Sequence, residues 1–407
     1  PHARDHLVVL GGMICLLAAF HFQLKIYDLP NVQRAVAPGP GYSDLNAYLP
    51  ALKLLRFAAF VSALLFWISP FSRLKLVLAG AGLLVGGSLL SVAYSGIVQR
   101  FIVAPNEIVK ETPYIQWAIQ HTREAFGIDK VQELEFDPAE NLTVQALRRN
   151  DLTVKNIRLW DHAPLKTTYS QLQEIRTYYD FLGVDNDRYH INGEYRQVML
   201  SPRELDPASL PSRIWINEHL TYTHGYGLTM GPVNRISREG LPEFFIKDIP
   251  PQSSIGLKVA RPEIYYGEAK GKYVIVNTQS KEFDYPSGDE NIYTKYKGTG
   301  GVPVSGFLRK LLFALRFKEI KILFSGDITS ESRILFHRNI SERLSKAAPF
   351  LRYDQDPYMV ISKEGRLYWI VDAYTTTDRY PYSERLQGIG NYIRNSVKVV
   401  VDAYNGS

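Results

Sequence analysis

The stretch LVLAGAGLLVGGSLLSVAYSGIV, residues 76–98, contains no charged residue and decides the class of fold. The hydrocarbon core of a bilayer is about 30 Å thick, and a helix needs about 20 apolar residues to cross it. Residues 6–27 form a second such run. Residues 52–69 form a third, in which Lys53 and Arg56 stand near one end, where long basic side chains can reach the headgroups. We therefore predict three membrane-spanning helices in the first quarter of the chain.

Most of the net charge belongs to residues 1–104, the predicted membrane region. These residues hold eight Lys and Arg against three Asp, which gives +5 of the formal +6 of the whole chain. Residues 105–407 are therefore nearly neutral, whereas a domain that binds nucleic acid needs a basic stripe. The composition argues against nucleic acid as a partner. The single cysteine, Cys15, allows neither an internal disulfide nor a cysteine metal site.

The distribution of Lys and Arg predicts an orientation in the membrane. Arg73 and Lys75 lie in the short loop between the second and third apolar runs, and short basic loops stay in the cytoplasm. The first helix then starts inside, near Arg4, and the third helix leads out. We expect a multi-pass protein of the bacterial plasma membrane, with residues 105–407 forming an extracytoplasmic domain.

Residues 105–407 mix helix and strand patterns without regular alternation, which is typical of a soluble α+β domain with mostly antiparallel strands. Residues 188–200 contain two strand-like runs joined by Asn192 and Gly193, the pair that a type I′ hairpin turn favours. Helices are expected at about 112–126, 169–182, 306–317 and 330–346, and strands at about 271–279, 365–375 and 396–404.

The segment WINEHLTYTHGYGL, residues 215–228, gathers polar groups that suit either catalysis or a structural turn. His219 and His224 are five residues apart, so they diverge by about 140° on a helix and lie on opposite faces of a strand. The H-E-x-x-H zinc motif needs a spacing of four on one helix face, which this pair lacks. We interpret the histidines as hydrogen-bonded loop residues; the alternative is a catalytic or metal role together with Glu218.

Asp372 is a further catalytic candidate, because it lies in the apolar run WIVDAY, residues 369–374. A buried charge must be paired or neutralised. Arg394 is the expected partner, and a structural ion pair is the alternative to a chemical role.

Two acidic pairs are the candidate metal ligands: Asp185 with Asp187, and Asp354 with Asp356. Each pair places two carboxylates on one side of an extended segment, which suits a hard cation such as Ca²⁺ or Mg²⁺. A carboxylate pair also serves glycoside hydrolysis, and turn chemistry explains an Asp that precedes Pro357. No other cofactor is indicated.

Nine segments in order carry a resemblance to a known family. The chain is similar to the bacterial membrane proteins grouped as uncharacterised protein family 0182, whose members are longer. The resemblance implies a multi-pass membrane protein with a large outer domain and no established reaction. It also implies an internal fragment, with the outer domain continuing past the last residue. The segments are APNEIVKETPYI, NIRLWD, QLQEIRTYYDF, DNDRYHINGEYRQVMLSPREL, NEHLTYTHGYG, EFDYP, APFLRYDQDPY, GRLYWIVDAYTTTDRYPYS and NYIRNSVKVVVDAYNG.

Two functional hypotheses remain open. The first is an envelope protein whose outer domain binds or scaffolds a glycan or protein component of the envelope. The alternative is a membrane-anchored enzyme that acts on envelope glycan or lipid, and convergence of the histidines and acidic pairs on one cleft would favour it. Membrane lipid and other spanning helices of the same longer chain are further expected partners. Gly82 and Gly86 form a G-x-x-x-G pair that either packs against such helices or only reflects a glycine-rich helix.

Overall fold

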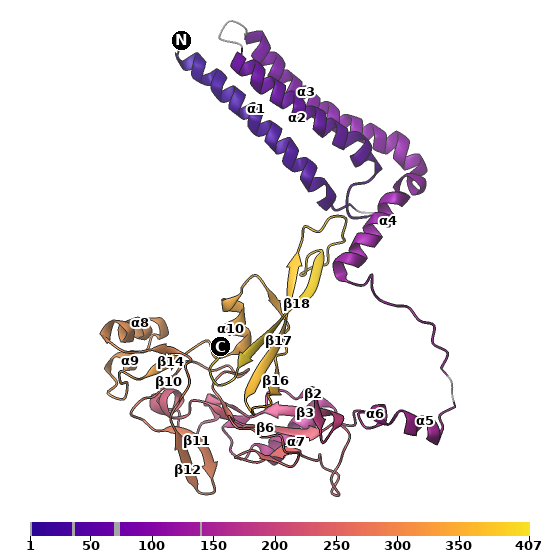
Figure 1. Cartoon of the computed structure of the whole chain (residues 1–407). Coiled ribbons are helices and arrows are strands. Elements are labelled where there is room, and N and C mark those ends of the chain that lie inside the picture. Colours follow the sequence, from indigo (N-terminus) through magenta and orange to yellow (C-terminus); the bar gives the residue numbers. More distant parts are fainter. Residues whose placement is uncertain (1, 35–36, 69–73, 139–140) are drawn as a thin grey trace. The chain divides into compact units, whose positions relative to one another are not determined.

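The structure, a computed structural model, forms two compact units (Figure 1). The described residues are 2–34, 37–68, 74–138 and 141–407. Unit 1 comprises Pro1–Leu134 and Thr375–Arg394, and unit 2 comprises Glu135–Tyr374 and Asn395–Ser407. The domain boundary predicted at residue 104 separates membrane-spanning residues from extracytoplasmic ones. The division into compact units does not test it, so this boundary stays a prediction.

Unit 1 is built on four helices: α1 (His2–Asp28), α2 (Leu49–Ile68), α3 (Leu74–Val98) and α4 (Glu107–Phe126). Helix α2 packs against both α1 and α3, with Cys15, Ala63 and Phe66 buried between them. Among the described residues, three helical stretches are long and apolar enough to cross a membrane, as the sequence predicted. They are Val8–Asn31, Asp44–Trp67 and Ala79–Phe126. The third is longer than predicted, because short π-helical and 3-10 turns, Gln99–Val103 and Ala104–Asn106, lead from α3 into α4.

Helix α4 begins earlier than the sequence predicted. It starts at Glu107 and not at about residue 112, so Pro113 lies inside the helix. The Thr112 hydroxyl donates to the Ile108 carbonyl one turn back. The predicted end is confirmed, because Gly127 takes a left-handed conformation with φ of 70° and caps the helix.

Unit 2 contains several small sheets, and each strand pair whose register is described is antiparallel, which confirms the predicted class. The largest sheet has the order β2-β3-β6-β7-β8: Asp185–Ile191, Glu194–Pro202, Leu228–Pro232, Ile246–Lys247 and Gln252–Ser253. A four-stranded sheet joins β15, β16, β17 and β18: Arg352–Tyr353, Tyr358–Ile361, Leu367–Thr377 and Tyr392–Asp402.

Smaller sheets complete unit 2. They are β10-β14-β13 (Val274–Val276, Arg333–Leu335, Val302–Pro303), β11-β12 (Glu282–Ser287, Glu290–Thr294), β1-β4 (Tyr179–Asp180, Glu204–Leu205) and β5-β9 (Gly225–Tyr226, Glu263–Ile264). The helices are α5 (Val144–Arg149), α6 (Asp151–Val154), α7 (His162–Gln173), α8 (Phe307–Phe317), α9 (Lys321–Phe324) and α10 (Ile340–Ala347).

The β2-β3 hairpin confirms the turn predicted from sequence. Asn192 and Gly193 both have positive φ, 53° and 81°, as a type I′ turn requires. Strand β17 shows the expected period of two, because Leu367, Trp369 and Val371 are buried in the main core while the residues between them are less buried. Local pattern and core packing therefore agree in both elements.

Helix α7 starts at His162, seven residues before the start predicted at residue 169. The side chain of Asp161 accepts a hydrogen bond from the His162 amide and caps the helix at its N-terminus. The helix ends at Gln173, shortly before Ile175 turns to a φ of 64°. The predicted helix 169–182 was wrong in its second half, because Tyr178 and Tyr179 there are buried in an aromatic cluster.

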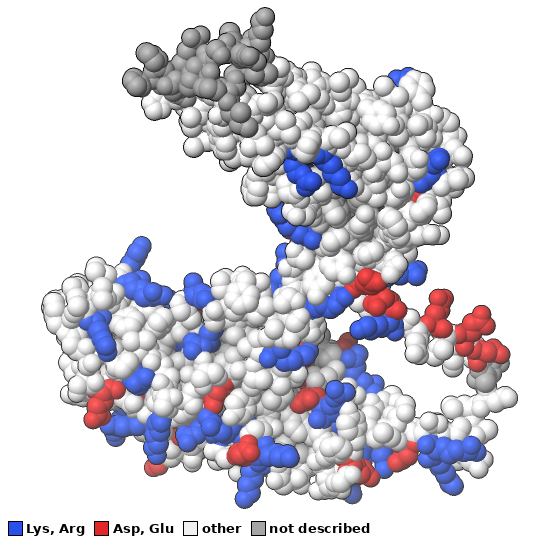
Figure 2. Space-filling model, turned by 45° about the horizontal axis from the view of Figure 1, so that its top comes forward, with Lys and Arg blue, Asp and Glu red and all other residues white. Residues whose placement is uncertain are grey.

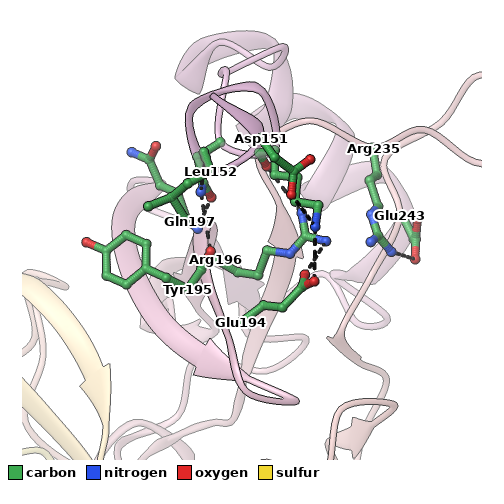
Figure 3. A network of polar contacts seen from close by, with 10 residues as sticks. Asp151, Leu152, Glu194, Tyr195, Arg196, Gln197, Arg235 and Glu243 are labelled. Carbon is green, nitrogen blue, oxygen red and sulfur yellow. Dashed lines mark hydrogen bonds and ion pairs between the residues drawn. The ribbon is translucent and has the colours of Figure 1, made fainter. Parts of the chain in front are cut away.

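A polar network fastens α6 to the edge of the main sheet (Figure 3). Lys155 contacts Asp151 at 2.6 Å and Glu194 at 3.0 Å, and Arg196 contacts Glu194 at 2.9 Å. The Gln197 amide of β3 donates to the Asn156 side chain over 2.7 Å. Surface ion pairs of this kind contribute little to stability, so the network mainly positions the segment.

Candidate functional site

The segment at residues 215–228 forms a π-helical turn, Asn217–Thr221, which leads into β5 and β6. A Cβ atom at Gly225 would lie 2.5 Å from the carbonyl oxygen of Arg203, so glycine is needed where β5 approaches β4. His219 and His224 have different neighbours on either side of this turn. The structure therefore separates the two histidines.

His224 lies inside a buried hydrogen-bonded network. Its side chain is buried, with Nε2 at 3.3 Å from Asp284 Oδ1 and Nδ1 at 2.9 Å from the Thr223 hydroxyl. The Thr223 hydroxyl also donates to Glu282 Oε2 over 3.4 Å. The Tyr265 ring packs beside the imidazole, and the Tyr265 hydroxyl donates to Glu282 over 3.2 Å. Both ring nitrogens are thus engaged within the fold, as expected of a structural residue.

Two charged residues that the sequence reading missed complete this network. Glu282 accepts the Asn277 amide over 2.8 Å, and burial raises the pKa of its carboxyl group. Arg338 donates to the carbonyl oxygens of Tyr265 and Thr223 over 2.6 and 2.7 Å, and burial lowers its pKa to about 10. Glu282 begins the family segment EFDYP, but the resemblance assigns no role to either residue, so only the tertiary structure reveals their role.

Arg203 is a further buried charge that no sequence pattern indicated. Its guanidinium donates to the carbonyl oxygen of Gln173 over 2.9 Å and to that of Tyr226 over 3.0 Å. Burial lowers its pKa to about 10. A cation at the C-terminal end of a helix satisfies carbonyls that lack intrahelical partners, so Arg203 joins α7 to β5.

His219 lines an open cleft of about 370 Å³ in unit 2. Its Nδ1–H donates to the Tyr273 carbonyl oxygen over 2.7 Å, and its ring stacks on the Tyr273 ring at 4.2 Å. Burial lowers the pKa of His219, which favours the neutral ring. With Nδ1 committed as a donor, Nε2 is left as an acceptor on a ring that lines the cleft. Lys272 also lines this cleft.

Arg316, which also lines the cleft, is held by several neighbouring side chains. The Arg316 guanidinium lies 5.1 Å from the Phe336 ring centroid and 3.0 Å from His337 Nε2. His337 Nδ1 lies 2.6 Å from Glu342 Oε1, so the ring donates to Glu342 and accepts from Arg316. His337 also has a φ of 48°, an unfavourable region for a residue with a side chain. These contacts hold Arg316 in place at the cleft.

The acidic pairs come together in part. Asp185 accepts the Met359 amide over 3.2 Å and faces β16. Burial raises the pKa of Asp185 to about 7, and the charges of Asp356 and Asp187 add to this rise. Burial also raises the pKa of Glu268 to about 8, with contributions from neighbouring carboxylates that include Asp185 and Asp356. Glu268, which the sequence analysis did not single out, is therefore close enough to Asp185 and Asp356 for their charges to act on it.

Asp354 has a different role from its predicted partner. Its side chain accepts the Asp356 amide over 3.3 Å, as in the turn chemistry considered from sequence. Within the described ranges, no three His, Cys, Asp or Glu side chains are grouped closely enough to hold a metal ion. A Ca²⁺ or Mg²⁺ site at these carboxylates stays a prediction.

The remaining catalytic candidates lie in separate places. Glu218 contacts Arg213 at 3.1 Å near the surface. Asp372 pairs with Lys398, whose charge and hydrogen bond lower the pKa of the Asp372 carboxyl group. The expected partner was wrong, because Arg394 donates to main-chain carbonyls of α4, including that of Ala125. Asp372 lies on the less buried face of β17. The ion pair with Lys398 of the neighbouring strand β18 is therefore enough to balance its charge.

The fold and these sites define a class of protein: apolar helices suited to membrane insertion, joined to an α+β unit with a polar cleft. The chain belongs to the Uncharacterised protein family (UPF0182), which matches residues 1–407. UPF0182 proteins of Geobacter sp. (strain M21) and Desulforamulus reducens are 52% and 50% identical to it, across all of this chain and 46% and 44% of their own length. A relative from Geobacter sulfurreducens is 52% identical across 99% of this chain and 45% of its own. No solved structure matches the chain at a significant level.

The chain thus spans about half the length of the curated relatives it matches. The family assignment agrees with the resemblance found in the sequence and carries no reaction with it. Any function must therefore be argued from the geometry of this chain.

Proposed function

We propose that this chain is part of a multi-pass envelope protein of the bacterial plasma membrane, with unit 2 as an extracytoplasmic binding domain. Support for insertion comes from the three apolar helical stretches. Support for the orientation comes from Arg73 and Lys75, which favour a cytoplasmic loop between the second and third apolar runs.

The main support for a binding role is that the candidate catalytic side chains lie apart from one another. His219 lines an open cleft, His224 is enclosed with Asp284, and Asp185 faces β16 with Asp356 nearby. An enzyme places its nucleophile, base and acid within hydrogen-bond reach of one reacting atom. These candidates have different neighbours, so the arrangement favours binding over catalysis.

The cleft beside His219 is the proposed binding site, and its ligand is an anionic group of an envelope component. Arg316 and Lys272 supply positive charge, and Tyr273, Phe317 and Phe336 supply aromatic faces. Two carboxylates, Glu319 and Glu342, also line the cleft, and His337 already binds Glu342. A guanidinium held in place by its neighbours recognises a carboxylate or phosphate through charge-assisted hydrogen bonds. Aromatic faces beside it suit the apolar surface of a sugar or glycerol unit.

Titration calorimetry on the full chain in detergent tests this site, with glycerol 3-phosphate and glucuronate as the phosphate and carboxylate probes. We expect at least one probe to bind. Arg316→Gln and Lys272→Gln should each weaken binding by roughly tenfold or more, because a hydrogen bond to a charged group is lost.

The matched control is Arg309→Gln, which removes an exposed cation from the same helix outside the cleft. Its affinity for the probe should equal that of the parent. Absence of binding by both probes would contradict the proposed site, as would an equal loss in the Arg309 variant.

A further inference from the structure

Helices α8 and α9 present an apolar surface to solvent that the cleft does not use. Six large apolar side chains on these helices and on the turn between them are between 57% and 76% exposed. We call this surface the α8–α9 face; its residues are Phe307, Leu308, Leu312, Leu315, Ile320 and Phe324. Scattered apolar residues are normal on a soluble protein, but a contiguous apolar face marks an interaction surface.

The exposed side chains are not the ones that hold these helices on the domain. Ala314 and Ile322 are buried in a second core, with Phe313 and Phe317 packed against it. Leu308, Leu312 and Leu315 have the spacing i, i+4, i+7, so they form one stripe along the opposite side of α8. The helix is therefore apolar on two sides, and only one side is covered within the described chain.

A shallow hollow of about 420 Å³ continues the face beside α9. Phe324 and Lys321 line it from α9, and Ile214, Trp215 and Ile216 line it from the segment before the π-helical turn. Ile214 and Ile216 are themselves exposed. The Trp215 indole nitrogen donates to the Tyr273 hydroxyl over 3.0 Å, so this aromatic side chain has a fixed place at the hollow.

The same two helices are strongly basic. Residues 307–324 contain five Lys and Arg against one Glu, a local charge of +4. Figure 2 shows Lys and Arg standing among uncharged surface at the left end of unit 2, where Figure 1 places α8 and α9. The basic residues are Arg309, Lys310, Arg316, Lys318 and Lys321.

We propose that the α8–α9 face docks on the anionic lipid surface of the membrane that holds the helices of unit 1. Exposed apolar side chains among Lys and Arg are the pattern of helices that lie in the headgroup region. Each basic residue near an anionic surface strengthens binding by roughly fivefold. Covalent attachment to a membrane-inserted segment also keeps unit 2 at a high local concentration near lipid.

This inference shares only Arg316 with the proposed cleft site, and its test relies on Arg309 and Lys321 instead. It requires insertion of the helices of unit 1, but it does not depend on the side of the membrane that unit 2 occupies. Failure of one proposal therefore leaves the other standing.

Depth-dependent fluorescence quenching tests the proposal on the full chain in lipid nanodiscs. In a Cys15→Ala background, an environment-sensitive dye is attached at Leu312→Cys or at Phe324→Cys. Nitroxide groups near the top of the lipid acyl chains should quench both dyes strongly when the disc contains anionic lipid. Ile236→Cys is the matched control, an exposed apolar position of unit 2 outside the face, and should stay unquenched.

Two comparisons separate docking from mere tethering. Quenching at Leu312→Cys should fall in zwitterionic discs, and it should fall in anionic discs when Arg309→Glu and Lys321→Glu are combined. Equal quenching at the control position, or quenching that ignores charge, would overturn the proposal. A dye that is shielded from water but not quenched by the lipid nitroxides would also overturn it, because it would show a protein partner on the face.

Discussion

His224 has two hydrogen-bond partners, and they predict how substitutions affect stability. Glutamine retains one donor and one acceptor, so His224→Gln should remain close to the parent in stability. His224→Leu leaves the Asp284 carboxylate without the imidazole and the Thr223 hydroxyl with Glu282 alone, which should cost roughly 1–3 kcal/mol. Thermal unfolding of the full chain in detergent measures both. Equal destabilisation by the two variants would contradict the hydrogen-bonding role.

Asp185 predicts a dependence of stability on pH. Its pKa rises from an ordinary 3.8 to about 7 in the folded protein, because burial disfavours the charged form. The folded state binds this proton more tightly than the unfolded state, so the stabilisation is complete below about pH 4 and is lost as the pH rises through about 7. The full effect corresponds to about 4 kcal/mol at most.

Asp185→Asn should therefore remove the loss of stability that ionisation of Asp185 causes at high pH. The amide does not ionise, and its oxygen can still accept the Met359 amide. We expect the variant to gain stability over the parent at pH 8 and to show a smaller gain or none at pH 5, measured by melting in detergent. Asp289→Asn, at an exposed turn, is the control and should leave stability unchanged at both pH 8 and pH 5. A gain at Asp185→Asn that is the same at both pH values would refute the assignment.

At the scale of elements, glycine positions decide where strands approach each other. Gly225 lies so close to β4 that an added methyl group would meet the Arg203 carbonyl oxygen at 2.5 Å and the Glu204 Cα at 2.8 Å. Because both contacts are with backbone, β5 or β4 must move. Gly225→Ala should cost about 1–3 kcal/mol in unfolding experiments. Gly183→Ala is the control, since its methyl group would meet nothing within 4 Å, and a similar cost at both positions would argue against this packing.

The elements also show which sequence signals could be trusted. The Asn192–Gly193 turn and the strand at about 365–375 were predicted correctly, because each follows from the conformation of a few neighbouring residues. The second half of the predicted helix 169–182 was wrong. Its tyrosines have a helix-compatible pattern, yet Tyr178 packs against Tyr222 and Phe283 from distant segments. Tertiary contacts of this kind override local propensity.

At the scale of the whole molecule, the predicted orientation in the membrane can be tested by labelling one position on each side. Cysteines introduced at Ser72 and Ser287, in a Cys15→Ala background, should react differently with a membrane-impermeant thiol reagent on intact spheroplasts. Ser72 lies outside the described residues, in the loop next to Arg73 that is predicted to be cytoplasmic; Ser287 is exposed in unit 2. Only the second position should be labelled. Both should be labelled once the membrane is permeabilised, and the reverse pattern in intact cells would invert the topology.

Sequence alone determined the class of this protein, because the length of an apolar run and a type I′ turn depend on residues that are close together in the chain. The family resemblance was visible for the same reason, through short segments in order. Tertiary structure alone decided the sites. It enclosed His224 with Asp284, placed His219 and Arg316 in the lining of one cleft, and brought Asp356 near Asp185, which lies 171 residues earlier. Charge, burial and hydrogen bonding act through space, so residues distant in sequence set the chemistry of each group.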